Sequence, residues 1–307
     1  MASVVIPAHD EAAVVARCLE ALDPARGDLV VVVVANACTD ATAEIARGFG
    51  VEVVETDVPG KAHALNLGDR TLDALGAGGL PRIYLDADVR LGAEDARRVA
   101  EHLRAGTSPA AAPRLRVDLT GCSWPVRAWY RVWTALPYVT HGMIGSGVYA
   151  LSPTGRARFG TFPEATGDDT FVRALFAESE RQTVPGAEFT VYPPRTLDAL
   201  VRIKTRVRYG NVEHAALSDA GTDASNDSGP GTAGPPGRAP EPGTAPSPVQ
   251  ALLRRPDVWP AVPVYAAVTV LTRLRAARRP AGSAGWDRDA TSRTPVPDPG
   301  PRASTPR

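Results

Sequence analysis

The sequence predicts an α/β fold in which helices cover both faces of a doubly wound, mostly parallel sheet. Two observations lead to this prediction. The first hundred residues alternate short apolar runs with stretches of helical periodicity, and such alternation is typical of proteins built from βαβ units. One apolar run, Leu29–Val34, is unbroken and β-branched, which favours a parallel strand that is buried on both faces.

The elements are expected in strict alternation. A strand at Ser3–Ile6 stops at Pro7, and a helix at Asp10–Leu22 begins with acidic residues at its positive end. Ligands of such sheets bind beyond the carboxyl ends of the strands, so functional residues are expected there. The remaining predicted elements are strand Leu29–Val34, a helix capped by Thr39 or Asp40, strand Val51–Val54, helix Lys61–Leu75, strand Arg82–Leu85 and helix Glu94–Arg104.

Beyond residue 105 the pattern is looser. Aromatic and apolar spacing predicts a helix at Trp124–Leu136, and two carboxylates open a second helix at Asp168–Ala177. A long basic helix is predicted at Thr196–Leu217. Short strands are predicted at Gly147–Leu151 and Glu188–Tyr192.

Glycine and proline divide the chain into regions. The chain has 28 glycines and 29 prolines, and their excess is concentrated in two stretches, residues 218–248 and 280–307, that have almost no large apolar side chains. Such stretches cannot bury enough apolar area to offset the entropy cost of ordering the backbone. We therefore expect a folded domain at residues 1–217, a disordered Gly/Pro-rich linker at 218–248, a helical appendage at 249–279 and a disordered tail at 280–307.

Charge and cysteine content exclude several classes of protein. The 34 basic and 34 acidic residues balance, which removes the electrostatic argument for a nucleic-acid-binding protein. The three cysteines are widely spaced and form no CxxC pair, so neither a disulfide framework nor a structural zinc site is expected. With no basic region before the first strand, a signal peptide is not expected, and the predicted location is the cytoplasm.

The C-terminal appendage suggests contact with a membrane. Its apolar run, Val258–Thr272, is shorter than the roughly 20 residues of a spanning helix. Arginines flank this run on both sides, and Trp259 and Tyr265 are residue types found at membrane interfaces. One interpretation is peripheral, in-plane attachment to the anionic inner face of the plasma membrane. The alternative is that the helix packs on the folded domain.

Paired carboxylates are the strongest candidates for a functional site. Asp86 and Asp88 follow the apolar run of a predicted strand, and residues two apart in extended backbone point to the same side. Two hard oxygen ligands without histidine or cysteine suit Mg²⁺ or Mn²⁺ shared with a diphosphate. The alternative interpretation is a pair of aspartates at a solvated strand end.

Two further charged groups complete this candidate site. Asp168 and Asp169 open a predicted helix, where carboxylates are common for electrostatic reasons alone. The later basic helix carries Arg202, Lys204, Arg206 and Arg208, which by themselves are equally consistent with a solvated face. Together the three groups supply a metal site, a base and a phosphate clamp for transfer from a nucleotide-diphosphate donor.

Five short motifs strengthen this interpretation. Val-Val-Ile-Pro-Ala-His-Asp-Glu, Asn-Ala-Cys-Thr-Asp-Ala-Thr, Gly-Lys-Ala-His-Ala-Leu-Asn, Leu-Asp-Ala-Asp and Gly-Asp-Asp follow one another across residues 3–172. In order and spacing they resemble family 2 glycosyltransferases of the GT-A fold, a Rossmann-like variant of the predicted sheet. The resemblance implies an inverting, metal-dependent enzyme that moves a sugar from a nucleotide-diphosphate-sugar donor to an acceptor hydroxyl, which could be lipid-linked.

The resemblance also implies roles for individual residues. Asp86 and Asp88 match the Asp-x-Asp that binds metal and donor diphosphate, and Asp169 matches the catalytic base. Asn36 stands where the family usually has an aspartate that reads the base and ribose. The other implied donor-binding residues are Pro7, Ala8 and Glu11 around the nucleoside, and Lys61 and Arg208 near the phosphates.

Two departures from the family pattern affect what is expected of the donor base and of the number of sugars added. Asn36 follows Ala35 where the family has an acidic pair, which weakens the case for uracil as the donor base. Thr205 and Tyr209 replace the glutamine and tryptophan of the processive motif, so a single addition is expected. His63 and His141 are interpreted as structural, and Gly145-Ser146-Gly147 as a simple turn.

Two other functions remain as alternatives. A sugar-phosphate nucleotidyltransferase could use a similar sheet and metal, although no glycine-rich phosphate loop with an arginine follows the first strand. A catalytically silent nucleotide-sugar-binding protein of the same fold would also explain the departures at Asn36, Thr205 and Tyr209.

Overall fold

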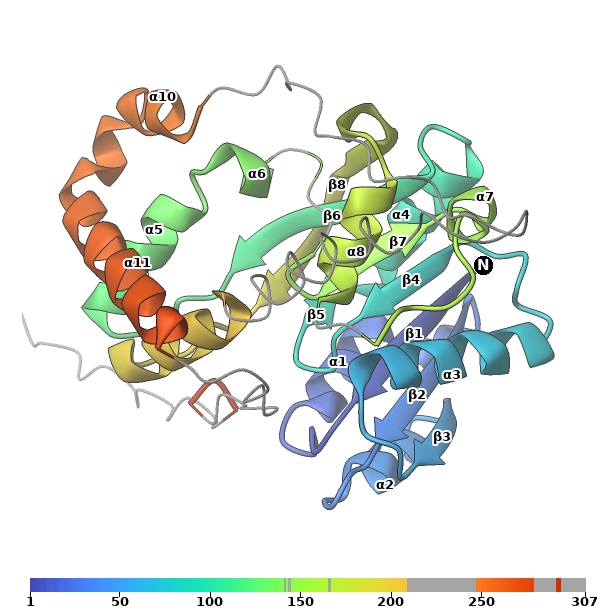
Figure 1. Ribbon diagram of the computed structural model, residues 1–307. Helices are drawn as coiled ribbons and strands as arrows, with labels where there is room; N and C mark the ends of the chain where they lie inside the picture. The colour runs from blue at the N-terminus through green and yellow to red at the C-terminus, as the bar shows by residue number, and fades with distance from the viewer. Residues whose placement is uncertain (141, 143–144, 165–166, 209–246, 279–290, 294–307) are drawn as a thin grey trace, which may run out of the picture.

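The computed structural model describes residues 1–140, 142, 145–164, 167–208, 247–278 and 291–293. Within these residues, eight strands form one mixed sheet in the order β3-β2-β1-β4-β7-β6-β8-β5 (Figure 1). The strands are β1 (Ala2–Ala8), β2 (Leu29–Asn36), β3 (Glu52–Thr56), β4 (Arg82–Leu85), β5 (Arg90–Leu91), β6 (Ala110–Val117), β7 (Val148–Leu151) and β8 (Arg181–Val191).

The N-terminal half of the sheet is parallel, as the alternating pattern predicts. β1 lies between β2 and β4, with Val5 opposite Val32 on one side and Tyr84 on the other. The predicted strands near residues 3, 29, 51 and 82 are all present. The carboxyl ends of β1, β2 and β4 therefore meet at one edge, which brings the predicted functional residues together.

The second half of the sheet is mixed. β7 runs antiparallel between β4 and β6, and β8 is parallel to β6 but antiparallel to β5. The structure contains the strands predicted near residues 147 and 188, although β8 begins earlier, at Arg181. β5 and β6 were not predicted. The β6 segment begins Ala-Ala-Ala-Pro, and only its pairing with β8 and β7 makes these small residues a strand.

Helices cover both faces of the sheet. Val4 and Ile6 pack toward α1 on one face, while Val5 packs with Leu65 of α3 on the other. The helices are α1 (Val15–Leu22), η1 (Pro24–Arg26), α2 (Thr42–Arg47), α3 (Lys61–Ala74), α4 (Ala93–Arg104), α5 (Trp124–Trp133), α6 (Pro137–Thr140), α7 (Pro153–Arg156), α8 (Asp168–Leu175) and η2 (Glu178–Glu180), then α10 (Pro248–Leu253), η3 (Pro256–Ala261) and α11 (Val262–Ala277).

The basic helix occupies residues 197–208, and residues 209–217 of its predicted length lie outside the described residues. It packs into a third apolar layer beside the sheet, where Leu200 and Val201 meet Val126 and Trp129 of α5. α11 completes this layer, next to α5 in Figure 1.

The C-terminal appendage packs on the folded domain along one face. Tyr265 of α11 stacks on Trp129 of α5 with ring centroids 5.6 Å apart, and Val258 is fully buried against Val132. Of the two interpretations of this segment, packing on the domain is therefore observed for its inner face. Within the described ranges, no helix combines the length and apolar character needed to cross a bilayer.

The tail differs from expectation at three residues. Residues 291–293 are described and form a turn. The Thr291 hydroxyl accepts a hydrogen bond from the Arg195 backbone N–H at 2.9 Å, and Arg293 reaches Glu11. Polar contacts rather than apolar burial hold this turn, whereas the sequence predicts a tail that is disordered throughout. The predicted linker and the remainder of the tail lie outside the described residues.

Candidate active site

A cleft of about 700 Å³ opens at the carboxyl ends of β1 and β4. The helix at residues 197–208 and the tail turn also contribute to its walls. Most of the predicted site residues line it, namely Pro7, Glu11, Lys61, Asp86, Asp88 and Asp169, whereas Ala8, Asn36 and Arg208 are not among the lining residues.

Lys61 is the central cation of the cleft. As the first residue of α3, it places its Nζ 2.7 Å from Asp86 Oδ1 and 2.9 Å from Asp168 Oδ1. Burial by itself would lower the pKa of Lys61, but the two carboxylates outweigh it and raise that pKa well above its usual range. Lys61 therefore stays protonated and links the end of β4 to the beginning of α8.

Asp88 faces the open part of the cleft. Its side chain is 48% exposed, and partial desolvation inside the cleft together with the charge of Asp86 raises its pKa. Two carboxylates that repel each other at a strand end bind a divalent cation well. The donor set of Asp86 and Asp88 is all oxygen, so these residues fit Mg²⁺ or Mn²⁺.

Asp168 and Asp169 have different environments although they are adjacent. Asp168 is nearly buried, is paired with Lys61, and accepts a hydrogen bond from the Tyr149 hydroxyl at 2.9 Å. Asp169 accepts a hydrogen bond from the Thr170 N–H, and burial followed by the charge of Asp168 raises its pKa. Both carboxylates line the cleft, but Asp168 is engaged by Lys61 and Tyr149, whereas Asp169 has a raised proton affinity.

The Gly145–Gly147 loop packs directly on Asp169 and on the segment that follows β4. A Cβ at Gly145, where φ is +130°, would lie 2.6 Å from Asp169 Oδ2, and one at Gly147 would lie 2.5 Å from the Val89 side chain. The loop forms the turn that was interpreted from the sequence, with Ser146 and Gly147 in turn conformation, and close packing requires glycine at both of its ends. Side chains at these positions would displace Asp169 and the segment that carries Asp86 and Asp88.

Asn36 positions a loop rather than lining the cleft. Its fully buried amide donates to the Val58 carbonyl at 2.8 Å and accepts from the Gly60 N–H at 3.0 Å. These bonds hold the residues just before Lys61. The resemblance implied that Asn36 reads the donor base, but here its side-chain amide is committed to the backbone.

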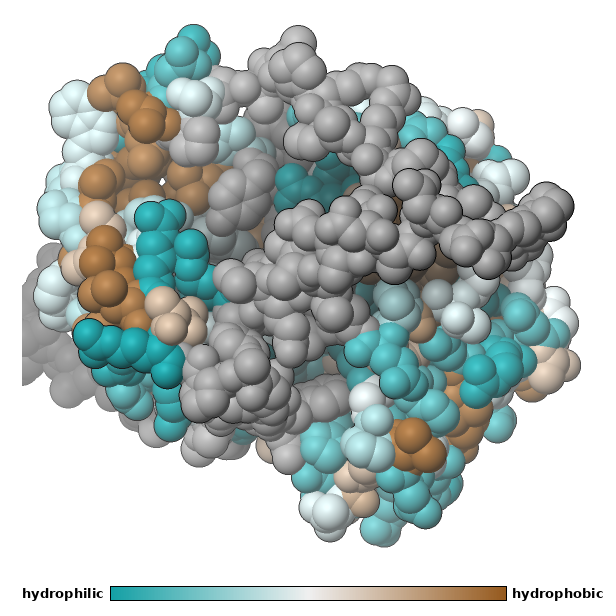
Figure 2. Space-filling model, viewed as in Figure 1, coloured by the Kyte–Doolittle hydropathy of each residue, from teal (hydrophilic) through white to brown (hydrophobic). Residues whose placement is uncertain are grey.

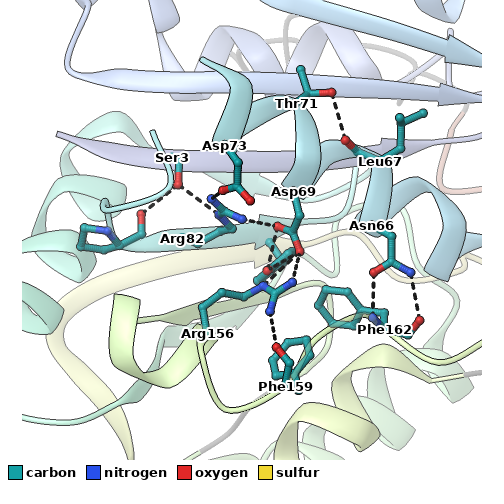
Figure 3. Close-up of polar contacts among 12 residues, drawn as sticks. Ser3, Asn66, Leu67, Asp69, Thr71, Asp73, Arg82, Arg156, Phe159 and Phe162 are labelled. Carbon is teal, nitrogen blue, oxygen red and sulfur yellow. Dashed lines mark hydrogen bonds and ion pairs between the residues drawn. The ribbon is translucent and has the colours of Figure 1, made fainter. Parts of the chain in front are cut away.

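A buried polar network joins β4 to α3 (Figure 3). Asp69 of α3 accepts from Arg82 of β4 at 2.7 Å and from Arg156 at 2.8 Å, and the Tyr84 hydroxyl also donates to it. Tyr84 stacks on Tyr149, the residue that donates to Asp168. Sequence reasoning missed this network because its members are spread over 87 residues and over four elements, α3, β4, β7 and α7.

The tail turn, residues 291–293, reaches the part of the cleft at the ends of β1 and β4. Arg293 forms an ion pair with Glu11 at 2.6 Å and lies 3.9 Å from Asp88 Oδ2. The two positions are separated by 282 residues, and a lone arginine in a proline-rich tail carries no recognisable signal. Sequence analysis could not have identified this contact.

The basic helix contributes cations to the cleft, but the expected Arg208 is not one of them. Lys204 and Arg206 line the cleft, and Arg208 does not. Thr205 points inward and donates to the Val201 carbonyl at 2.7 Å. The helix contributes to the lining as far as Val207, and a phosphate contact of Arg208 stays a prediction.

A second group of ligand atoms lies at the ends of β1 and β2. Asp10, Cys38 and Asp40 bring one potential ligand atom each within 4.8 Å of one another. The Asp10 carboxylate accepts hydrogen bonds from Thr39, and Asp40 accepts from Ala12 and Thr42. These bonds tie two loops together and account for both carboxylates.

Comparison with known proteins agrees with this geometry. Residues 3–136 match the model of Glycosyl transferase family 2, and this region contains β1, β4 and both aspartates of the Asp86–Asp88 pair. Residues 3–136 form a family 2 glycosyltransferase domain. The resemblance seen in the motifs and the predicted GT-A-like fold are thereby confirmed. Curated protein sequences gave no match to the chain.

One solved structure supports the GT-A-like fold of this chain, and two others are less similar to it. The mannosyltransferase PcManGT from Pyrobaculum calidifontis, in complex with GDP-Man and Mn²⁺, is 22% identical with a TM-score of 0.54, over 89% of this chain and 75% of that chain. S. aureus TarS is 14% identical with a TM-score of 0.49, over 63% and 37% of the two chains. Glucosyl-3-phosphoglycerate synthase from Mycobacterium tuberculosis is 20% identical with a TM-score of 0.47, over 69% and 79%.

Proposed function

We propose that this glycosyltransferase is metal-dependent and inverting, and that it adds one sugar from a nucleotide-diphosphate sugar to an acceptor hydroxyl. The observation that carries the proposal is the convergence of Asp86, Asp88 and Asp169 on one cleft. Inversion needs a base and a leaving-group site on opposite sides of the anomeric carbon. Asp169 at the start of α8 and the pair after β4 line the same cleft from separate elements, which supports such an arrangement.

Asp86 and Asp88 are proposed to hold Mg²⁺ or Mn²⁺ together with oxygens of the donor diphosphate. When bound, the metal supplies positive charge that stabilises the leaving nucleoside diphosphate. Lys61 contacts Asp86 directly, so its ammonium lies beside the position proposed for the diphosphate. PcManGT, which is similar in fold to this chain, contains Mn²⁺ and GDP-Man, which supports this assignment.

Asp169 is proposed as the general base. The acceptor hydroxyl attacks the anomeric carbon as the bond to the diphosphate oxygen breaks, and its proton passes to an Asp169 carboxylate oxygen. The transition state resembles the oxocarbenium ion of glycoside hydrolysis. Because burial raises the pKa of Asp169, its carboxylate is a better proton acceptor than an exposed aspartate.

The nucleoside is proposed to lie against Pro7, Ala8 and Glu11 at the end of β1. Pro7 and Glu11 line the cleft, and Ala8 is buried between them. Asn36 is proposed to act on the donor indirectly, by holding the loop before Lys61. Thr205, which is turned into the helix, and Tyr209 stand in place of the processive motif, so a single addition per binding event is proposed.

One experiment tests this function. The purified protein is incubated with a panel of UDP- and GDP-sugars, Mn²⁺ and simple alcohol acceptors. Release of nucleoside diphosphate together with a glycoside of inverted anomeric configuration by NMR is expected. Release of pyrophosphate would indicate a nucleotidyltransferase instead, and absence of any turnover would favour a silent binding protein.

Peripheral attachment to the inner face of the plasma membrane is a separate proposal. Val270 and Leu274 on the outer face of α11 are 53% exposed, and Trp259 is 51% exposed. Figure 2 shows apolar surface along α10, η3 and α11. Arginines at both ends of the segment would face anionic lipid.

The membrane proposal predicts that the protein pellets with anionic phosphatidylglycerol vesicles and that Leu271→Glu with Leu274→Glu abolishes pelleting. Leu197→Glu, which changes an exposed leucine on a different helix, serves as the control. Equal pelleting of the double variant and the wild type would contradict the proposal.

A further inference from the structure

Lys204 occupies an unusual position for a lysine. Its Nζ lies over three aromatic rings of α5, at 4.6 Å from the ring centroid of Trp129, 5.0 Å from Trp133 and 5.6 Å from Tyr130. Lys204, Trp133 and Tyr130 also line the same cleft as Asp169. The ammonium is therefore held in an apolar setting at the wall of the active site.

Lys204 has no carboxylate partner in the part of the chain that the structure describes. Burial alone lowers its pKa to about 8, and no acidic group opposes this shift. Lys61, in the same cleft, has two carboxylates against its ammonium. A desolvated cation without a counter-ion is costly, and contact with aromatic rings recovers only part of that cost.

The aromatic rings do not by themselves account for a lysine. A methionine would fill the same space against Trp129 and Trp133 without the cost of burying a charge. A locally unfavourable charge in a cleft is typical of a group that meets a ligand. The ligand that would satisfy this partly buried ammonium, which has no carboxylate against it among the described residues, is an anion.

The donor diphosphate does not explain this cation. The cations that contact the carboxylates of the donor side are Lys61, from α3, and Arg293, from the tail. Lys204 instead belongs to the layer formed by the basic helix and α5. Its charge is therefore available to a second anion in the cleft. The second reactant of a glycosyl transfer is the acceptor, so we assign this anion to the acceptor.

We propose that the acceptor is a phosphate ester, whose phosphate binds Lys204 and whose remaining part lies against Trp133 and Tyr130. This inference rests on the proposed function in naming the ligand an acceptor. The phosphate can come from a lipid, in which case the apolar chain extends along the aromatic wall, or from a water-soluble ester. The recognition chemistry at Lys204 is the same in both cases.

The test measures binding to the full-length protein by calorimetry with three probes, namely geranyl phosphate, geraniol and glycerol 3-phosphate. We expect geranyl phosphate to bind and geraniol to bind at least tenfold more weakly. Lys204→Met is expected to weaken phosphate binding by about 10- to 100-fold, the usual effect of removing a charged hydrogen-bond partner. Arg202→Met, on the exposed side of the same helix, should bind like the wild type.

The probes also separate the two sources of the phosphate. Binding of geranyl phosphate without glycerol 3-phosphate indicates a lipid-linked acceptor, and binding of both with similar affinity indicates a soluble ester. Lys204→Arg should restore most of the binding because it keeps the positive charge.

Three outcomes would overturn the proposal: no binding of either phosphate probe, equal binding of geraniol and geranyl phosphate, or unchanged phosphate binding by Lys204→Met. Binding of nucleoside diphosphate with Mn²⁺ is measured in parallel on each variant and should be the same in Lys204→Met as in the wild type. If the wild type does not bind nucleoside diphosphate with Mn²⁺, the proposed function is contradicted. The phosphate measurements would then still test whether Lys204 binds a phosphate ester.

Discussion

Arg293 of the C-terminal tail forms an ion pair with Glu11, at the end of the first strand, with 2.6 Å between Nη2 and Oε1. The same guanidinium lies 3.9 Å from Asp88. The tail therefore brings positive charge to a site whose own carboxylates would repel an anionic donor.

Removing this charge should weaken donor binding. We expect Arg293→Ala to raise the Kd for nucleoside diphosphate in the presence of Mn²⁺ by about tenfold, in line with the loss of one charge-assisted contact. Calorimetry checks this, with Arg293→Lys as the variant that retains the charge. Tighter binding by Arg293→Ala would show instead that the tail obstructs the donor site.

Replacing the proposed base should separate binding from turnover. Asp169→Asn is expected to bind donor normally but to lose transfer activity by about 10²- to 10⁴-fold, the usual contribution of a positioned base. Steady-state kinetics and calorimetry on the same preparation provide the measurement. Near-normal turnover would remove Asp169 from the mechanism and make Asp168 the next candidate.

The metal assignment predicts that donor and metal bind together. Two carboxylates need phosphate oxygens to complete the coordination of Mg²⁺ or Mn²⁺, so metal alone should bind weakly. Calorimetry should show that nucleoside diphosphate strengthens Mn²⁺ binding in the wild type and has no such effect in Asp88→Ala. Donor binding that neither chelator nor Asp88→Ala affects would contradict the assignment.

The setting of Lys204 predicts a pH-dependent stability. Its pKa is about 8 in the folded protein and near 10.5 when unfolded, so between these values the unfolded chain binds more protons. The free energy of unfolding of the wild type should therefore rise with pH in this window relative to Lys204→Met. Below about pH 8 the variant should be the more stable by ~1–3 kcal/mol.

This prediction is checked by urea unfolding of both proteins at several pH values. A stability difference that does not change between pH 7 and pH 10 would show that Lys204 is not desolvated. Arg202→Met provides the control for replacing a charge on the exposed face of the same helix.

The buried network behind β4 predicts a large loss of stability. Asp69→Asn leaves Arg82, whose side chain is 3% exposed, without its buried carboxylate. Removing one partner of a buried ion pair costs ~3–5 kcal/mol. Asp73→Asn removes the second partner of Arg82, but Asp73 is 62% exposed, so a loss below ~1 kcal/mol is expected there. Equal losses in the two variants would contradict this account.

Much of the fold could be predicted because it depends on local sequence patterns. The β-branched run that becomes β2 can be buried only as a strand covered on both faces. β4 has its predicted bounds, and Asp86 and Asp88 follow it directly. In a parallel sheet the strand ends lie at one edge, so the grouping of these carboxylates with Lys61 followed from topology alone.

Contacts between distant segments required the tertiary structure. No periodicity relates Arg293 to Glu11, because the contact depends on the path of the chain between them. Likewise, Lys204 and Arg208 are indistinguishable as members of a basic helix, yet Lys204 lines the cleft and Arg208 does not. The packing of the helix against α5 decides which cation enters the cleft, and that packing is a property of two surfaces rather than of either sequence segment.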